Sequence, residues 1–237
     1  VHSSTGIPLR VTLPFHVTEL ADSNLKDYIY TGGNEPLRHL EFFRAICRAV
    51  QRIHAHQVCH RDIKPDNFFI IQRRRMCLGD FGSATVLDGS ELPLSSEYRG
   101  WRGDRRYTAP EMFAGLDHHV RLFYCADMFS LGAILFEMFT KNSLFSTIFD
   151  ATWQDDLLAH FLLMDPNKRA GVFGRLVSDI ALQRRLPDLQ DFGNPIPSRI
   201  GFRLNRLYKG LACLDYTCRL RDFGLVFSEI NRCVTVL

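Results

Sequence analysis

The chain has 237 residues, of which 46% are hydrophobic and 23% are charged, and this composition is typical of a globular protein with one large domain or two small ones. The formal net charge of +3 is too small to indicate nucleic acid or a membrane surface as the main partner. The best membrane-span candidate, Met128–Phe139, is too short and contains Glu137. Seven scattered cysteines without CxxC spacing predict reduced thiols in a cytoplasmic protein, and they indicate neither a zinc site nor a redox motif.

The N-terminal part of the chain predicts strands followed by helices. Apolar and polar residues alternate within 9–19, which predicts one or two strands. The polar residues 21–24 predict a turn and the start of a short helix that ends near Gly32. Apolar residues at helical spacing then predict an amphipathic helix from Leu37 to His56.

The rest of the chain is predicted to be mainly helical. Two short β-type runs, Phe68–Ile71 and Met76–Leu78, predict a hairpin, and the polar residues 83–106 predict a long exposed loop. Ala126–Thr140 is apolar nearly all round, which predicts a buried central helix. Further helices are expected at Asp155–Met164, Phe202–Leu214 and Arg221–Cys233, with an irregular proline-containing stretch at 186–201.

Three motifs in a fixed order indicate the family. They are Cys59–Asn67 (CHRDIKPDN), Leu78–Gly82 (LGDFG) and Tyr107–Glu111 (YTAPE). Any one of them would be a weak signal, but independent motifs in the right order reinforce one another. Together they resemble the catalytic loop, the magnesium motif and the end of the activation segment of protein kinases. The chain therefore resembles a eukaryotic-type serine/threonine protein kinase.

This resemblance implies an α+β fold that is mainly α, namely a kinase C-lobe with one or two residual N-lobe strands. Residues 1–22 would hold those strands and the hinge, and residues 23–237 would form the C-lobe. Within the C-lobe, the catalytic loop would be 60–67 and the activation segment 80–111.

The resemblance also assigns roles to individual residues. Asp62 would orient the substrate hydroxyl and accept its proton, and Lys64 would neutralise charge on the moving phosphoryl group. Asn67 and Asp80 would be the ligands of Mg²⁺. The nucleotide-binding residues implied are Glu19, Ala21, Lys64, Asp66, Asn67, Phe69 and Asp80. ATP and Mg²⁺ are then the expected cofactors, and a protein substrate is the expected partner.

The sequence leaves alternatives open for the acceptor residue of the substrate and for phosphorylation of the activation segment. In the family, a lysine at the position of Lys64 accompanies serine/threonine specificity. Gly103-Asp104 stands where the family has Gly-Thr, however, so the threonine that bridges the aspartate and the lysine is absent and dual specificity stays open. Arg61 would pair with an anion, either a phosphorylated residue of the activation segment or none if the loop is never modified. The candidate phosphorylation sites are Ser95, Ser96 and Tyr98.

Two structural contacts are expected as well. Glu111 should form a buried ion pair with a C-lobe arginine, for which Arg219 fits better than Arg169 because it lies in the final helical pair. Asp127, in the central helix, should cap the backbone of the His60–Arg61 turn.

The function expected is ATP-dependent transfer of the γ-phosphate to Ser/Thr hydroxyls of proteins. The residues before Glu19 contain one glycine, Gly6, and no lysine, so the Gly-rich loop and the β3 lysine of a complete kinase are not found in them. The chain is then a fragment or a truncated relative, with little activity expected alone. The main alternative is a non-catalytic pseudokinase or scaffold. A small-molecule kinase ranks last because such enzymes lack a long activation segment.

Overall fold

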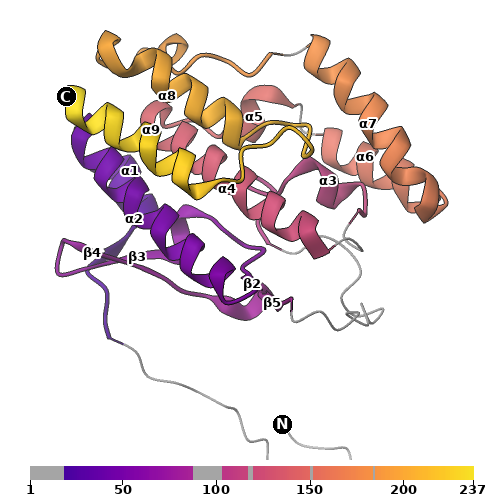
Figure 1. Ribbon diagram of the computed structural model, residues 1–237, viewed down its shortest axis with the longest axis horizontal. Coiled ribbons are helices and arrows are strands. Elements are labelled where there is room, and N and C mark those ends of the chain that lie inside the picture. The colour runs from indigo at the N-terminus through magenta and orange to yellow at the C-terminus, as the bar shows by residue number, and fades with distance from the viewer. Residues whose placement is uncertain (1–18, 88–102, 117–119, 150–151, 184) are drawn as a thin grey trace, which may run out of the picture.

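The computed structural model describes residues 19–87, 103–116, 120–149, 152–183 and 185–237. Helices dominate, and the short strands gather at one side of the molecule beside α2, while α4 runs through the middle of the helices (Figure 1). This is the helix-rich α+β architecture expected from the motifs. The strands expected within 9–19, the phosphorylation candidates and most of the 83–106 loop lie outside the described residues.

The first described elements follow the predicted order. The helix α1 (Leu25–Thr31) begins at Asn24, whose side chain accepts a hydrogen bond from the backbone N–H of Asp27 at 2.8 Å and so satisfies a free donor of the first turn. The amphipathic helix α2 (Pro36–Ala55) has a proline in its first turn, where no backbone donor is needed. Both helices occur where the apolar periodicity predicted them.

Two small antiparallel sheets position the catalytic loop. The predicted hairpin is formed by β3 (Phe68–Ile71) and β4 (Arg75–Leu78), and β1 (Ser23–Asn24) pairs with β3 on its other side. The second sheet joins β2 (Val58–Cys59) to β5 (Thr85–Val86). The 3₁₀ turns η1 (Pro65–Asn67) and η2 (Phe81–Ser83) flank the hairpin. The catalytic loop therefore lies between β2 and β3, with both of its ends held in sheets.

The central helix α4 (Val120–Thr140) is the core of the fold. From Leu122 onward its side chains are buried except for that of Tyr124, which is half-buried, and the helix packs against α2, α8 (Ser198–Leu211) and α5 (Leu144–Ile148). A Cβ added at Gly132 would lie 2.6 Å from the backbone nitrogen of Ala212, so only glycine allows this close approach.

The C-terminal half contains two helices that the sequence did not predict, the short helix α5 and the longer helix α7 (Pro166–Gln183). The helix α6 (Trp153–Leu162) matches the helix expected at Asp155–Met164, and α7 begins at Pro166, shortly after α6 ends. The helix α8 begins at Ser198 instead of Phe202, so the stretch expected to be irregular ends earlier; it contains the 3₁₀ turn η4 (Leu189–Phe192). The short helix α3 (Pro110–Phe113) and the last helix, α9 (Phe223–Val236), complete the fold.

The buried ion pair predicted for Glu111 is present. Arg219 Nη2 lies 3.0 Å from Glu111 Oε2, a second and shorter contact joins Nη1 to Oε1, and both side chains are fully buried. Arg219 also donates to the carbonyls of Cys125 and Cys213 at 2.9 Å. The rival candidate, Arg169, donates instead to backbone carbonyls. The choice of Arg219 is therefore confirmed.

Within the described residues, one helical stretch, Leu122–Thr140, is long and apolar enough to cross a membrane by those two measures. It is longer than the Met128–Phe139 stretch singled out in the sequence, but 94% of it is buried inside the fold. Its apolar character is therefore explained by its place in the protein core.

Candidate active site

A cleft of about 1150 Å³ opens between the start of α1 and the β3–β4 hairpin. Four of the residues predicted to bind nucleotide line it, namely Glu19, Ala21, Phe69 and Asp80. Its size and its largely apolar wall suit a flat heterocyclic ligand. The cleft is also lined by Ser23, Asn24, Asp27 and Cys77, which the sequence reading had not singled out. No motif marks these four, because only the fold brings them to the cleft.

The predicted catalytic residues form one connected group in the loop before β3. Lys64 Nζ donates to Asp62 Oδ2 at 2.7 Å. The amide nitrogen of Asn67 donates to the same oxygen at 3.1 Å and to the backbone carbonyl of Asp62 at 2.8 Å. Since the amide nitrogen of Asn67 faces Asp62, its carbonyl oxygen remains for another partner. Asp62, Lys64 and Asn67 are therefore linked through the carboxylate of Asp62 and the amide of Asn67.

The activation segment contributes a third donor to the same carboxylate. The backbone N–H of Asp104 donates to Asp62 Oδ1 at 2.9 Å. This approach depends on Gly103, whose φ is +97° and at which a Cβ would lie 2.7 Å from both Asp62 Oδ1 and the carbonyl oxygen of Arg61. A side chain at this position would therefore push the segment off the catalytic loop.

Asp80 directly follows Gly79, which is hydrogen-bonded to the catalytic loop. The N–H of Gly79 donates to the carbonyl of Asn67 at 2.9 Å, and His60 Nε2 contacts the carbonyl of Gly79 at 3.0 Å. Asp80 itself has a left-handed backbone with φ of 59°, a conformation that is uncommon for non-glycine residues but that aspartate adopts more readily than most. The ring of the following residue, Phe81, lies 5.0 Å from the His60 ring, centroid to centroid.

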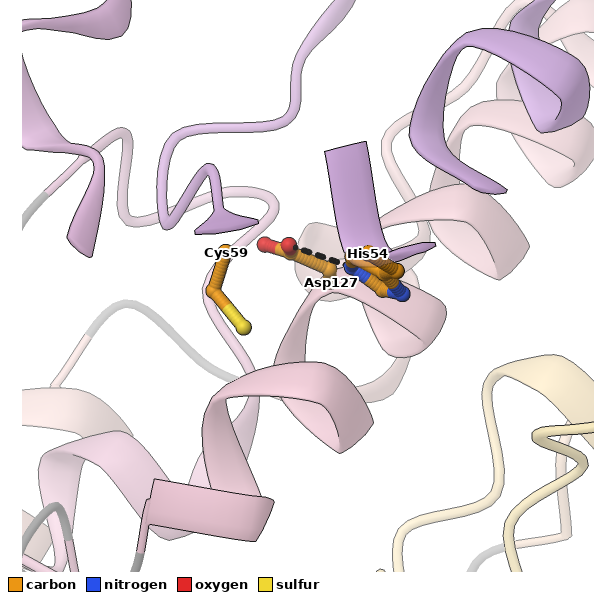
Figure 2. Close-up of side chains that lie close together, drawn as sticks. All are labelled: His54, Cys59 and Asp127. Atoms are coloured by element: carbon orange, nitrogen blue, oxygen red, sulfur yellow. Dashed lines mark hydrogen bonds and ion pairs between the residues drawn. The ribbon is translucent and has the colours of Figure 1, made fainter. Parts of the chain in front are cut away.

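The central helix α4 is hydrogen-bonded to the start of the catalytic loop. The carboxylate of Asp127 accepts hydrogen bonds from the backbone N–H groups of His60 at 2.9 Å and Arg61 at 3.0 Å, so the predicted cap is confirmed. A further contact, between Asp127 and His54 Nε2 at 2.9 Å, had not been predicted (Figure 2). One buried side chain of α4 thus holds the turn that precedes Asp62.

The group formed by His54, Cys59 and Asp127 has the composition of a metal site, with its ligand atoms within 4.8 Å of one another. Three hydrogen bonds already occupy the Asp127 carboxylate, and burial raises the pKa of the Cys59 thiol, with the Asp127 charge adding to the effect. A neutral thiol is a poor metal ligand. Figure 2 shows the hydrogen bond between His54 and Asp127, with the thiol to one side. The group is therefore best explained as a loop support.

Arg61 contacts a hydroxyl group and an aromatic ring. Its backbone has φ of 66°. Its Nη1 donates to the hydroxyl of Thr85 at 3.0 Å, and its guanidinium lies 4.5 Å from the centroid of the Phe123 ring. The question of whether a phosphorylated residue also reaches this arginine concerns residues outside the described part of the chain.

Two further acidic groups lie near the catalytic residues: Asp66, which the sequence placed in the catalytic loop and among the nucleotide-binding residues, and Glu137, which the sequence did not link to the loop. Asp66 forms an ion pair with Lys26 of α1 at 2.9 Å, and its other carboxylate oxygen is buried without a hydrogen-bond partner among the described residues. Glu137, which interrupts the apolar pattern of α4, accepts hydrogen bonds from the hydroxyls of Tyr30 and Tyr107. This buried carboxylate therefore connects α1, α4 and the end of the activation segment.

The charges around Asp62 influence one another. Partial burial disfavours the ammonium of Lys64, but the hydrogen bond to Asp62 and the charges of Asp62, Asp104 and Asp66 together raise the pKa of Lys64. Burial likewise opposes ionisation of Asp104, but its hydrogen bonds to Arg106 and the charge of Lys64 lower its pKa. Both side chains are thus held in their charged forms.

The structure thus combines a helical lobe, a loop with Asp62, Lys64 and Asn67, and a cleft of a size that suits a nucleotide. This combination is typical of kinase-like folds. Comparison with known sequences agrees, because the family model described as "Protein kinase domain" matches residues 14–164, more than half of the chain. The chain belongs to the protein kinase family of the eukaryotic type.

Two of the curated proteins that the chain resembles come from Dictyostelium discoideum. The probable serine/threonine-protein kinase glkA is 34% identical over 103 residues, which cover 44% of this chain and 20% of that protein. A second probable serine/threonine-protein kinase is 29% identical over 167 residues, which cover 62% of this chain and 19% of that protein. The matched segments thus span about a fifth of these relatives.

Proposed function

We propose that the chain is the catalytic lobe of an ATP-dependent protein kinase that phosphorylates Ser/Thr hydroxyls of proteins. The observation that carries this proposal is the environment of the Asp62 carboxylate. It accepts from Lys64, from Asn67 and from the backbone of Asp104. An ionised carboxylate has about four acceptor sites, so one site remains for a substrate hydroxyl.

The proposed chemistry follows from this geometry. The free acceptor site of Asp62 orients the substrate hydroxyl and takes up its proton as the oxygen attacks the terminal phosphorus of ATP. Lys64 provides a fixed positive charge close to Asp62, where negative charge on the transferred group is compensated. Positioning of this kind accounts for most of the catalysis in phosphoryl transfer.

The cleft and the loop also suit the two expected cofactors. Glu19, Ala21 and Phe69 line the cleft that would hold the nucleotide, and Lys64 and Asp66 of the catalytic loop would contribute further contacts to it. The carbonyl oxygen of Asn67 and the exposed carboxylate of Asp80 are hard oxygen donors of the type that Mg²⁺ prefers. When bound there, the metal would neutralise charge on the phosphates.

The wider setting is part of the same proposal. A cytoplasmic location is supported by seven free thiols. Serine/threonine specificity is supported by Lys64 and by the names of the two relatives, although Asp104 replaces the threonine that usually accompanies it.

Radiolabelled phosphate transfer to a generic protein substrate tests the function. The experiment uses the full-length protein, with Asp62→Asn as the critical variant and Asp165→Asn, an exposed change away from the loop, as the matched control. We expect Asp62→Asn to lower kcat by at least about 100-fold, because general-base catalysis contributes about 10²–10⁴-fold. Equal turnover in the wild type and Asp62→Asn would refute the role proposed for Asp62, and no turnover in either would favour the pseudokinase alternative.

A further inference from the structure

Asp104 occupies an unusual position for an acidic residue. Its backbone N–H holds Asp62 at 2.9 Å, and its carboxylate is close enough to Lys64 for each charge to affect the protonation of the other. The charges of two carboxylates, Asp62 and Asp104, therefore both act on the ammonium of Lys64. Lys64 nevertheless hydrogen-bonds to Asp62, at 2.7 Å.

Arg106 explains why Asp104 does not capture Lys64. The Asp104 carboxylate accepts three hydrogen bonds from this one residue: from its backbone N–H at 2.9 Å, from Nε at 3.1 Å and from Nη2 at 2.7 Å. The side-chain part is a two-pronged contact, which is the strongest form of arginine–carboxylate pairing.

The guanidinium of Arg106 is itself held in place. It lies 5.5 Å from the centroid of the Tyr107 ring, and Tyr107 is anchored through its hydroxyl to the buried Glu137. The acceptor sites of Asp104 are therefore directed toward Arg106, and the net charge of the pair near Lys64 is close to zero.

We propose that Arg106 is a positioning residue for Lys64: by clamping the Asp104 carboxylate, it keeps the Lys64 ammonium on Asp62. Without Arg106, the two carboxylates compete for Lys64, and the ammonium is drawn away from the position that phosphoryl transfer needs. This inference rests on the proposed kinase function of Asp62 and Lys64, but the clamp itself can be measured without any catalysis.

The first measurement is the rate at which acetic anhydride acetylates Lys64, followed by mass spectrometry of the full-length protein at fixed pH, with Lys209 as the internal reference. Only the neutral amine reacts. Arg106→Ala leaves the Asp104 charge uncompensated, so we expect acetylation of Lys64 to slow by about threefold. Asp104→Asn should accelerate it, and the double variant should return close to the wild-type rate.

The control is Arg105→Ala, which removes a neighbouring arginine that pairs with Asp155 of α6 instead. It should leave the Lys64 rate unchanged. Arg106 is partly exposed, with 44% of its side chain accessible, and thermal unfolding will show that each variant is folded. Equal Lys64 rates in Arg106→Ala and the wild type would overturn the proposal. A double variant as slow as Arg106→Ala would also overturn it, because Arg106 would not then act through Asp104.

The second measurement is phosphate transfer by the same variants. We expect kcat to fall about tenfold in Arg106→Ala and to recover in the double variant, with KM for the protein substrate nearly unchanged. Slow acetylation with an unchanged kcat would overturn the positioning role. If the acetylation pattern is as expected but the wild type transfers no phosphate, the clamp is supported and the proposed kinase function is refuted.

Discussion

The buried pair of Glu111 and Arg219 should be a large contributor to stability. Each side chain is fully buried, and Arg219 also donates to two backbone carbonyls at 2.9 Å. Removing one partner leaves an unpaired charge in the core, which typically costs about 3–5 kcal/mol. Glu111→Leu and Arg219→Met should therefore each lower the free energy of unfolding by that amount, or the melting temperature by about 10 °C.

The double variant distinguishes the ion pair from general packing. Because it removes both charges together, its loss should be smaller than the sum of the two single losses by about 2–3 kcal/mol. Urea unfolding followed by circular dichroism measures all four proteins. The exposed pair of Lys209 and Asp188 is the control, and Lys209→Met should cost less than about 1 kcal/mol. Additive losses, or a loss below about 1 kcal/mol for Glu111→Leu, would refute the reasoning.

Two further predictions use urea unfolding as well. Gly132→Ala should destabilise the fold by about 1–3 kcal/mol, because the new Cβ would lie 2.6 Å from the nitrogen of Ala212. Gly171→Ala, in an open position of α7, should instead stabilise by up to about 1 kcal/mol; the same sign for both would contradict this. Burial, aided by the charge of Lys141, lowers the pKa of His39 below its ordinary 6.5. The unfolded chain then binds more protons, so unfolding free energy should fall as pH drops from 6.5 toward the folded pKa. His39→Gln should weaken this dependence between pH 7.5 and 5.5, and an unchanged slope would count against it.

The periodic elements of the fold were predictable from the sequence because their signals are local. The apolar spacing of α2, the two short β-type runs of the hairpin and the continuous apolar run of α4 each needed only neighbouring residues. The helix α7 was missed for a specific reason. Pro166 follows directly after the helix expected at Asp155–Met164, where a proline is typical of a helix end, but proline is also favoured in the first turn of a helix. The apolar residues Phe173 and Val177 then continue at helical spacing.

The candidate site likewise contains residues that a local motif predicts and contacts that only the fold creates. Asp62, Lys64 and Asn67 belong to one short motif, so the sequence alone grouped them. The part played by Asp104 depends on its backbone N–H and on the positive φ of Gly103, neither of which is visible in residue types. Glu137 was noted only as a charge within an apolar helix, because its partner Tyr30 is 107 residues away in the chain.

The anchoring of the catalytic loop by Asp127 has a consequence for its motions. The amide protons of His60 and Arg61 are donated to a carboxylate that is 1% exposed and lies on the core helix α4. These two amides can exchange with deuterated water only when the loop separates from that helix. Their exchange should therefore be as slow as that of the amides of α4 itself and should report on global unfolding. The most rigid point of the candidate site would then be the turn just before Asp62, where backbone precision matters most.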